Sequence, residues 1–163
     1  MEKSIQSSQL DKIDKRIIAI LANNGRLSLT QLAEQVGLSK TPCQVRLKRL
    51  INEGYITGFR AILNLEKLGL NHIAFTEVKL TTTKEETLHD FNQAVKKIYE
   101  VEECHMIASA FDYLLKVRTR DIHHYRVVLG EKISTLPNVA STSTFIVMQN
   151  VIDNNFQRQL LTF

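Results

Sequence analysis

Basic and short polar side chains are concentrated in one short stretch of the chain. Between residues 39 and 60 there are five Lys or Arg residues and one acidic residue, Glu53. Lys and Arg side chains bind DNA phosphates, and these contacts set the register of a protein on the duplex. Short polar and small apolar side chains reach base edges, through hydrogen bonds or contact with the thymine methyl group. The stretch is therefore a candidate for binding double-stranded DNA.

The candidate DNA-binding residues lie on one predicted helix and just beyond it. They are Ser39, Lys40, Thr41, Pro42, Gln44, Val45, Arg46, Lys48, Arg49 and Arg60. We expect base-edge contacts from Thr41, Gln44 and Val45, and phosphate contacts from the Lys and Arg residues. A basic helix face alone more often indicates only a solvated surface, so the alternative is a three-helix core without a DNA partner.

Two short helices are predicted before this stretch. Apolar residues recur at i, i+4, i+7 and i+8 from Ile13, and Gly25 ends that helix because glycine tolerates the left-handed conformation. Ser28 caps a second helix, and Gly37 ends it after about two turns.

The third helix begins at Ser39 or Thr41 and is amphipathic. Its expected buried residues recur at i, i+4, i+7 and i+8: Cys43, Leu47, Leu50 and Ile51. This placement favours a core role for Cys43 over a role as a nucleophile. Residues 55–62 have the pattern of a short hairpin, so residues 1–62 are predicted to form a winged helix-turn-helix. That combination favours DNA binding over a merely solvated face.

The rest of the chain alternates between strand and helix patterns. Strands are predicted at residues 73–80, 101–108, 113–119 and 139–151, and helices at 83–99 and 122–136. The order is that of a ferredoxin-like βαββαβ domain over residues 73–153. Residues 63–72 would connect it to the first domain, and residues 154–163 would form a tail. The predicted fold class is α+β.

One face of the predicted sheet has no helix to cover it. Along the last strand that face carries either Phe145 and Val147 or Ile146 and Met148, depending on the register. An apolar sheet face is most simply buried against another copy of the same chain. The sequence therefore predicts a homo-oligomer.

The charge is unevenly distributed along the chain. The 163 residues carry a net charge of +4. Residues 1–65 have ten Lys and Arg against five Asp and Glu, a net +5, whereas residues 66–163 have eleven against twelve, a net −1. A basic first part and a nearly neutral second part indicate two parts with different partners.

Other features restrict the class of protein. Two cysteines cannot make a disulfide framework, and neither a secretory signal nor an apolar run of about 20 residues is present. We therefore expect a cytoplasmic protein without membrane contact. No phosphate loop, catalytic motif or set of metal ligands is recognisable, so we expect no catalytic residues and no metal.

Several motifs, taken together, resemble the Lrp/AsnC family of bacterial and archaeal transcriptional regulators. They run in order from Leu10 to about Asp153: LDKID at 10–14, NGRLS at 24–28, VGLSKTPC at 36–43, RLKRL at 46–50, GYI at 54–56 and FDYLL at 111–115. The TPC run and ECH at 103–105 look closest to the leucine-responsive branch. The resemblance implies a homodimer built through the second-domain sheets, which assembles into tetramers, octamers or larger discs.

The resemblance also implies an amino-acid effector, and no other cofactor, that changes assembly or DNA affinity. Leucine is the first expectation and proline the second. The implied effector-binding residues are Met106, Ser109, Ala110, Asp112, Ile122, Phe145, Ile146 and Val147. Ser109 stands where the family commonly has Gly, which would allow a positive φ or close ligand approach. Asp112 holds either a ligand ammonium group or the amides of its turn. The apolar members more often form an interface core than a ligand site.

Three functions follow as alternatives. The first is a sequence-specific transcriptional regulator of amino-acid metabolism genes that responds to an amino acid. The second is an architectural protein that bends or coats DNA without a ligand. The third is an amino-acid-sensing module or a small enzyme, since ferredoxin-like domains also serve there. The basic face of the third helix favours the first two.

Overall fold

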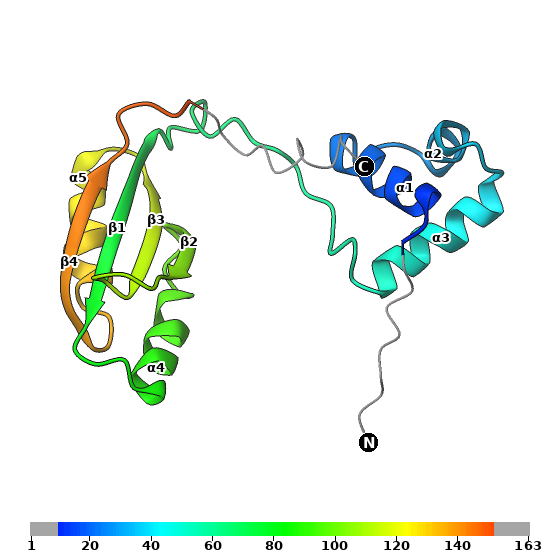
Figure 1. Ribbon diagram of the computed structural model, residues 1–163. Coiled ribbons are helices and arrows are strands. Elements are labelled where there is room, and N and C mark those ends of the chain that lie inside the picture. The colour runs from blue at the N-terminus through cyan, green and yellow to red at the C-terminus, as the bar shows by residue number, and fades with distance from the viewer. Residues whose placement is uncertain (1–9, 152–163) are drawn as a thin grey trace, which may run out of the picture. The chain divides into compact units, whose positions relative to one another are not determined.

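The computed structural model describes residues 10–151 and divides them into two compact units. The first unit comprises residues 10–62 and the second Leu63–Val151. The predicted tail at residues 154–163 lies outside the described residues, as do the last two residues of the predicted second domain. Each unit is described by itself below (Figure 1).

Local capping sets the first two helices. Helix α1 (Lys12–Asn23) begins after Asp11, whose side chain accepts a hydrogen bond from the Asp14 amide at 2.8 Å. The Asp14 side chain in turn accepts one from the Asp11 amide at 3.2 Å. Ser28 caps helix α2 (Leu29–Val36) in the same reciprocal way. Such capping boxes satisfy amides that a helix start leaves unpaired, and the predicted Ser28 cap is confirmed.

A left-handed glycine connects α2 to helix α3 (Lys40–Asn52). Gly37 has φ 72° and ψ 33°, a conformation that side chains with a Cβ disfavour. Ser39 occupies the N-cap position of α3, and Pro42 lies in its first turn, where the missing amide has no intrahelical partner to lose. The predicted helix-turn-helix is confirmed.

The three helices bury one apolar cluster. Cys43 and Leu50 of α3 are fully buried in it together with residues of α1 and α2. The prediction for Ile51 was wrong, because 42% of this residue is exposed. Eight residues advance about 80° beyond two full turns, so Ile51 lies at the edge of the stripe that Cys43 begins.

The hairpin predicted at residues 55–62 is absent: within the described part of the chain, no strand precedes β1 (His72–Leu80). The Ile56 amide instead donates to the Leu50 carbonyl at 3.1 Å and closes the end of α3. The following residues have no regular secondary structure until a turn at 65–69. An isolated two-stranded hairpin is only marginally stable, and among residues 10–151 no strand pairs with this segment.

The second unit is a four-stranded antiparallel sheet with two helices. Its order is β2-β3-β1-β4, with β2 (Val101–Met106), β3 (Tyr113–Thr119) and β4 (Val139–Ile146). Helices α4 (Glu85–Val95) and α5 (Ile122–Val128) lie on the same face of the sheet (Figure 1). The predicted βαββαβ arrangement is confirmed.

Helix α5 ends earlier than predicted because the chain widens into a π-helical turn, η1 (Leu129–Ile133). The Ser134 amide donates to the Leu129 carbonyl at 2.8 Å, an i to i+5 bond. In an α-helix, Val128 and Ile133 would point about 140° apart. The wider turn brings them closer in direction, and both are fully buried in one core.

Strand β4 also ends earlier than predicted, at Ile146 instead of residue 151. The Val147 amide still donates to the Ile73 carbonyl at 3.0 Å, but β1 begins at His72 and offers no further partner. A strand needs a neighbour as well as propensity, so β4 stops where β1 starts.

Alternation along β1 divides the unit into a core face and an open face. Thr76, Val78 and Leu80 are buried on the face that packs against the helices. Glu77 and Lys79 point to the other face, which neither α4 nor α5 covers. The central strand of the sheet therefore carries both the core and a pair of opposite charges.

Aromatic residues and paired hydroxyls fill the core. The rings of Phe91 and Tyr113 lie 4.4 Å apart between centroids. The Tyr125 hydroxyl lies 2.9 Å from the Thr76 hydroxyl and 2.6 Å from that of Thr144. The buried polar groups of these three residues are therefore satisfied within the core.

Phe91→Ala should destabilise the second unit by about 3 to 5 kcal/mol, because it leaves a cavity at a fully buried aromatic position. Urea unfolding followed by circular dichroism measures the loss. Tyr99→Ala is the matched control, since 97% of Tyr99 is exposed and its loss should cost less than about 0.5 kcal/mol. Equal effects of the two substitutions would contradict the core assignment.

Candidate functional site

Most of the predicted DNA-binding residues are exposed on α3. Thr41, Gln44, Val45 and Lys48 are spaced i, i+3, i+4 and i+7, so they share one face of the helix. Val45 is 63% exposed, which suits contact with a thymine methyl group. The remaining exposed candidates flank this face in sequence: Ser39, Lys40 and Pro42 at the start of α3, and Arg60 on the segment after it.

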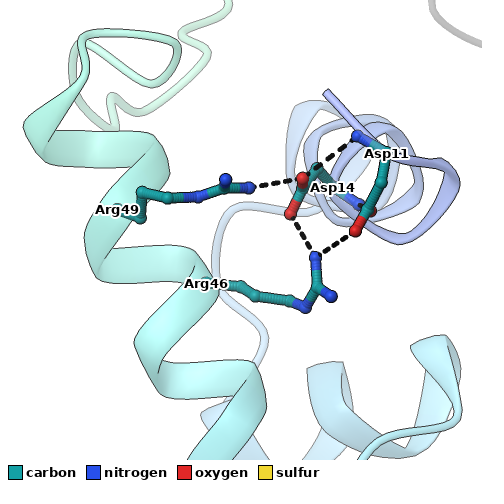
Figure 2. Close-up of polar contacts among 4 residues, drawn as sticks. All are labelled: Asp11, Asp14, Arg46 and Arg49. Carbon is teal, nitrogen blue, oxygen red and sulfur yellow. Dashed lines mark hydrogen bonds and ion pairs between the residues drawn. The ribbon is translucent and has the colours of Figure 1, made fainter. Parts of the chain in front are cut away.

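Arg46 and Arg49 point away from that face and toward α1 (Figure 2). The Arg46 Nη1 atom lies 2.5 Å from Asp11 Oδ2 and 2.9 Å from Asp14 Oδ1. The Arg49 Nη2 atom pairs with Asp14 Oδ2. The sequence predicted phosphate contacts from both arginines, whereas the structure pairs them with carboxylates of the same unit. The reason is the Asp14 carboxylate, which is 1% exposed and needs cationic partners.

These contacts shift the pKa values of the charged groups. The pKa of Asp11 is lowered, first by the hydrogen bond from the Asp14 amide and then by Arg46. The carboxylates raise the pKa of both Arg46 and Arg49. Burial raises the pKa of the Cys43 thiol, which keeps it protonated and confirms its interpretation as a core residue.

In the second unit, Asp112 holds the loop between β2 and β3 against β1. Its Oδ2 atom accepts a hydrogen bond from the Leu80 amide at 2.7 Å, and its own amide donates to the Val78 carbonyl at 3.0 Å. Its carbonyl accepts from the Ile107 amide at 2.9 Å. The second carboxylate oxygen lies 4.0 Å from Lys79 Nζ. Asp112 was predicted either to bind a ligand ammonium group or to bond the amides of its turn. The contacts favour a role in shaping the loop, but the amide that its side chain bonds is that of Leu80 in β1.

A pocket of about 160 Å³ opens beside this loop on the open face of the sheet. Its lining comprises Glu77, Lys79, Ala110, Phe111, Ser141 and Ser143. The register places Glu77 opposite Ser143 and Lys79 opposite Ser141. The Lys79 ammonium donates to the Ala110 carbonyl at 2.9 Å. A carboxylate, an ammonium group and two hydroxyls therefore meet in one small pocket.

Of the predicted effector residues, only Ala110 lines this pocket. Met106 and Ile146 lie on strand positions that face the helix-covered side, and Ile122 begins α5 on that side. Ser109 precedes Ala110 in the loop, and its φ is outside the left-handed region, so its backbone does not require glycine.

Sequence reasoning missed five of the six pocket residues. The alternation of β1 already placed Glu77 and Lys79 opposite the core, which was a usable signal. The serines carried no such signal, because only the pairing of β1 with β4 brings them to the same place.

The register also decides which apolar residues lie on the open face. Phe145 is directly opposite Phe75, and Val147 bonds Ile73, so the first of the two predicted pairs faces outward. The strands at the other edge carry polar side chains joined by ion pairs and hydrogen bonds: Glu102, Glu103, His105, Lys116 and Arg118. The open face is therefore apolar only in part, which corrects the expectation of an apolar face.

Comparisons with known proteins decide the family. Residues 73–155 match the model of the Lrp/AsnC ligand binding domain, and residues 10–57 match that of a winged helix-turn-helix DNA-binding domain. The chain belongs to the Lrp/AsnC family. It is a DNA-binding transcriptional regulator with an amino-acid ligand-binding domain, and it is not an enzyme.

Two curated relatives match this Lrp/AsnC chain over nearly its whole length. The proline dehydrogenase transcriptional activator of Rhizobium radiobacter is 64% identical over 151 residues, 93% of this chain and 97% of the relative. The leucine-responsive regulatory protein of Escherichia coli is 40% identical over 153 residues, 94% of this chain and 93% of the relative.

Solved structures agree with the fold. A transcriptional regulator of Neisseria meningitidis in complex with L-Met has a TM-score of 0.82 and 31% identity, covering 88% of this chain and 92% of that one. AsnC of Escherichia coli has a TM-score of 0.83 and 28% identity, covering 91% and 98%. None of the helices within residues 10–151 has the length and apolar character needed to span a membrane.

Acid should weaken the first unit of this Lrp/AsnC regulator through Asp11. The pKa of this carboxyl is lowered in the folded state, so its charge stabilises the fold at pH values above its unfolded pKa of about 4. That stabilisation is lost as the pH falls through the folded pKa. Thermal unfolding measured from about pH 6 to about pH 3 would show the loss.

Asp11→Asn provides the control, because asparagine still caps a helix but does not titrate. We expect the variant to lose less stability than the wild type over the same pH range. Identical losses in the two proteins would show that the pairing of Asp11 does not contribute.

Proposed function

We propose that this Lrp/AsnC regulator binds a specific DNA site through the exposed face of α3 and responds to proline or leucine. The exposed face of Thr41, Gln44, Val45 and Lys48 on the second helix of a helix-turn-helix carries the proposal. Within residues 10–151, Lys48 forms no ion pair, so its charge is available to a phosphate.

The proposal assigns separate tasks to the parts of the chain. Residues 1–62 bind DNA, residues 63–72 connect, and residues 73–153 bind the amino acid and assemble the oligomer. The net charge of +5 over residues 1–65 against −1 over the remainder supports this division. A cytoplasmic location follows from the DNA target.

The relatives support proline ahead of leucine. The relative with 64% identity is named a proline dehydrogenase transcriptional activator, and so is one from Rhodobacter capsulatus with 49% identity over 146 residues. The leucine-responsive relative has 40% identity. This order reverses the one expected from the motifs, and it makes genes of proline use the first candidates for control.

The amino acid binds in the pocket beside the β2–β3 loop. Lys79 pairs with the ligand carboxylate, and Glu77 pairs with its ammonium group, while Ser141 and Ser143 supply hydroxyls. The volume of about 160 Å³ is below the roughly 300 to 1,000 Å³ of drug-sized sites and suits one amino acid. The ligand competes with the Ala110 carbonyl for Lys79, which links binding to the position of the loop.

Assembly covers the open face of the sheet. Phe145 is 55% exposed beside Phe75, and a second copy of the chain provides the simplest apolar cover for this pair. A homodimer formed in this way is the unit for tetramers, octamers or larger assemblies. Each added subunit brings another α3, so a weakly basic chain gains DNA affinity through multivalency.

Lys48→Ala should weaken binding to the protein's own upstream DNA and lower the slope of log K against log salt by about 0.9, because one phosphate contact is lost. Binding curves at several salt concentrations measure both effects. The control is Lys96→Ala, an exposed lysine after α4 in the second unit. An unchanged slope in Lys48→Ala would refute the assignment of this face.

Lys79→Met should abolish the response to proline and leave DNA binding without an amino acid intact. Gel shifts and light scattering with each amino acid in turn would read DNA affinity and assembly in the same samples. Lys96→Met is the control, since it removes an equal charge away from the pocket. A wild-type protein that responds to no amino acid would support the architectural function instead, and a response unchanged in Lys79→Met would exclude the pocket.

A further inference from the structure

Half of the basic residues on α3 are engaged inside the first unit. Lys40 and Lys48 are exposed, whereas Arg46 and Arg49 contact the two carboxylates at the start of α1. Lys and Arg side chains on a DNA-binding helix are common phosphate contacts. In Figure 2 Arg46 and Arg49 point instead toward carboxylates of the same unit.

All the carboxylate oxygens of this cluster have partners. Asp14 Oδ1 accepts from Arg46 at 2.9 Å, and Asp14 Oδ2 accepts from Arg49 and from the Asp11 amide. Asp11 Oδ1 accepts from the Asp14 amide at 2.8 Å, and Asp11 Oδ2 accepts from Arg46 at 2.5 Å. The capping box of α1 therefore also holds the two guanidinium groups.

The arginines are held but are not sealed from solvent. Their side chains are 30% and 35% exposed, whereas that of Asp14 is 1% exposed. Guanidinium groups bind phosphate with fork geometry regardless of base sequence, so free arginines here would add affinity for any DNA. The carboxylates of Asp11 and Asp14 accept the guanidinium hydrogen bonds in place of phosphate.

We propose that Asp11 and Asp14 withhold Arg46 and Arg49 from the DNA backbone, so that the discrimination between sites rests on the outer face of α3. The carboxylates are positioning groups that act through the arginines and do not themselves contact DNA. This inference rests on the proposed DNA-binding face. It makes the aspartates determinants of specificity, because they remove contacts that all sequences share.

Asp14→Asn tests the inference, since asparagine keeps the size and can still accept the Asp11 amide hydrogen bond. We expect the salt slope to steepen by about one and binding to a scrambled duplex at low salt to tighten roughly tenfold. The preference for the specific upstream DNA over the scrambled duplex should fall. The charge-matched control is Glu34→Gln, on an exposed position of α2, which should leave the slope unchanged.

A second variant keeps the test valid if Asp14→Asn does not fold. Replacing both aspartates by Asn and both arginines by Gln removes two charges of each sign and leaves the net charge unaltered. We expect this quadruple variant to retain the wild-type salt slope. A slope lower by about two would show that the arginines contact phosphates and would overturn the inference.

The outcomes separate this inference from the DNA-binding proposal. If Lys48→Ala leaves DNA binding unchanged, the proposed face itself is wrong. If Lys48→Ala weakens binding but Asp14→Asn leaves the slope and the preference unchanged, only the inference fails. Equal weakening of both duplexes by Asp14→Asn would indicate a purely structural role for the carboxylate and would also overturn it.

Discussion

The first unit depends on the buried carboxylate of Asp14. This carboxylate is 1% exposed, and the two guanidinium groups that reach it from α3 compensate its charge. Its Oδ2 atom also accepts the Asp11 amide, so the same side chain closes the start of α1. The Asp14 side chain therefore contributes both to the start of α1 and to the packing of α3 on α1. That packing sets the direction in which Thr41 and Lys48 face.

The second unit depends on the central position of β1. This strand pairs with β3 on one side and β4 on the other, so its alternation organises both faces of the sheet. One face forms the core with Phe91 and Tyr113. The other face brings Glu77 and Lys79 beside the serines of β4 and the loop held by Asp112. An amino-acid site and a subunit interface can lie on the same face, because Phe75 and Phe145 are not among the residues that line the pocket.

The features predicted well were those with short-range causes. The Ser28 cap, the Gly37 turn and the alternation of β1 depend on residues within about four positions, and the structure confirms each. The predictions of a hairpin at 55–62 and of a β4 that reaches residue 151 were wrong for the same reason. Strand propensity is local, but a strand forms only where another strand is available to pair with it.

The sequence by itself determined the helix-turn-helix, the βαββαβ order, the outward face of α3 and the resemblance to the Lrp/AsnC family. Only the tertiary structure decided where Arg46 and Arg49 point and which residues meet in the pocket. Arg46 and Asp11 are 35 positions apart, and Lys79 meets Ser141 only through the register of two strands. A local sequence pattern does not identify partners that lie so far apart along the chain. Those contacts are set by how the helices pack and by the register of the strands.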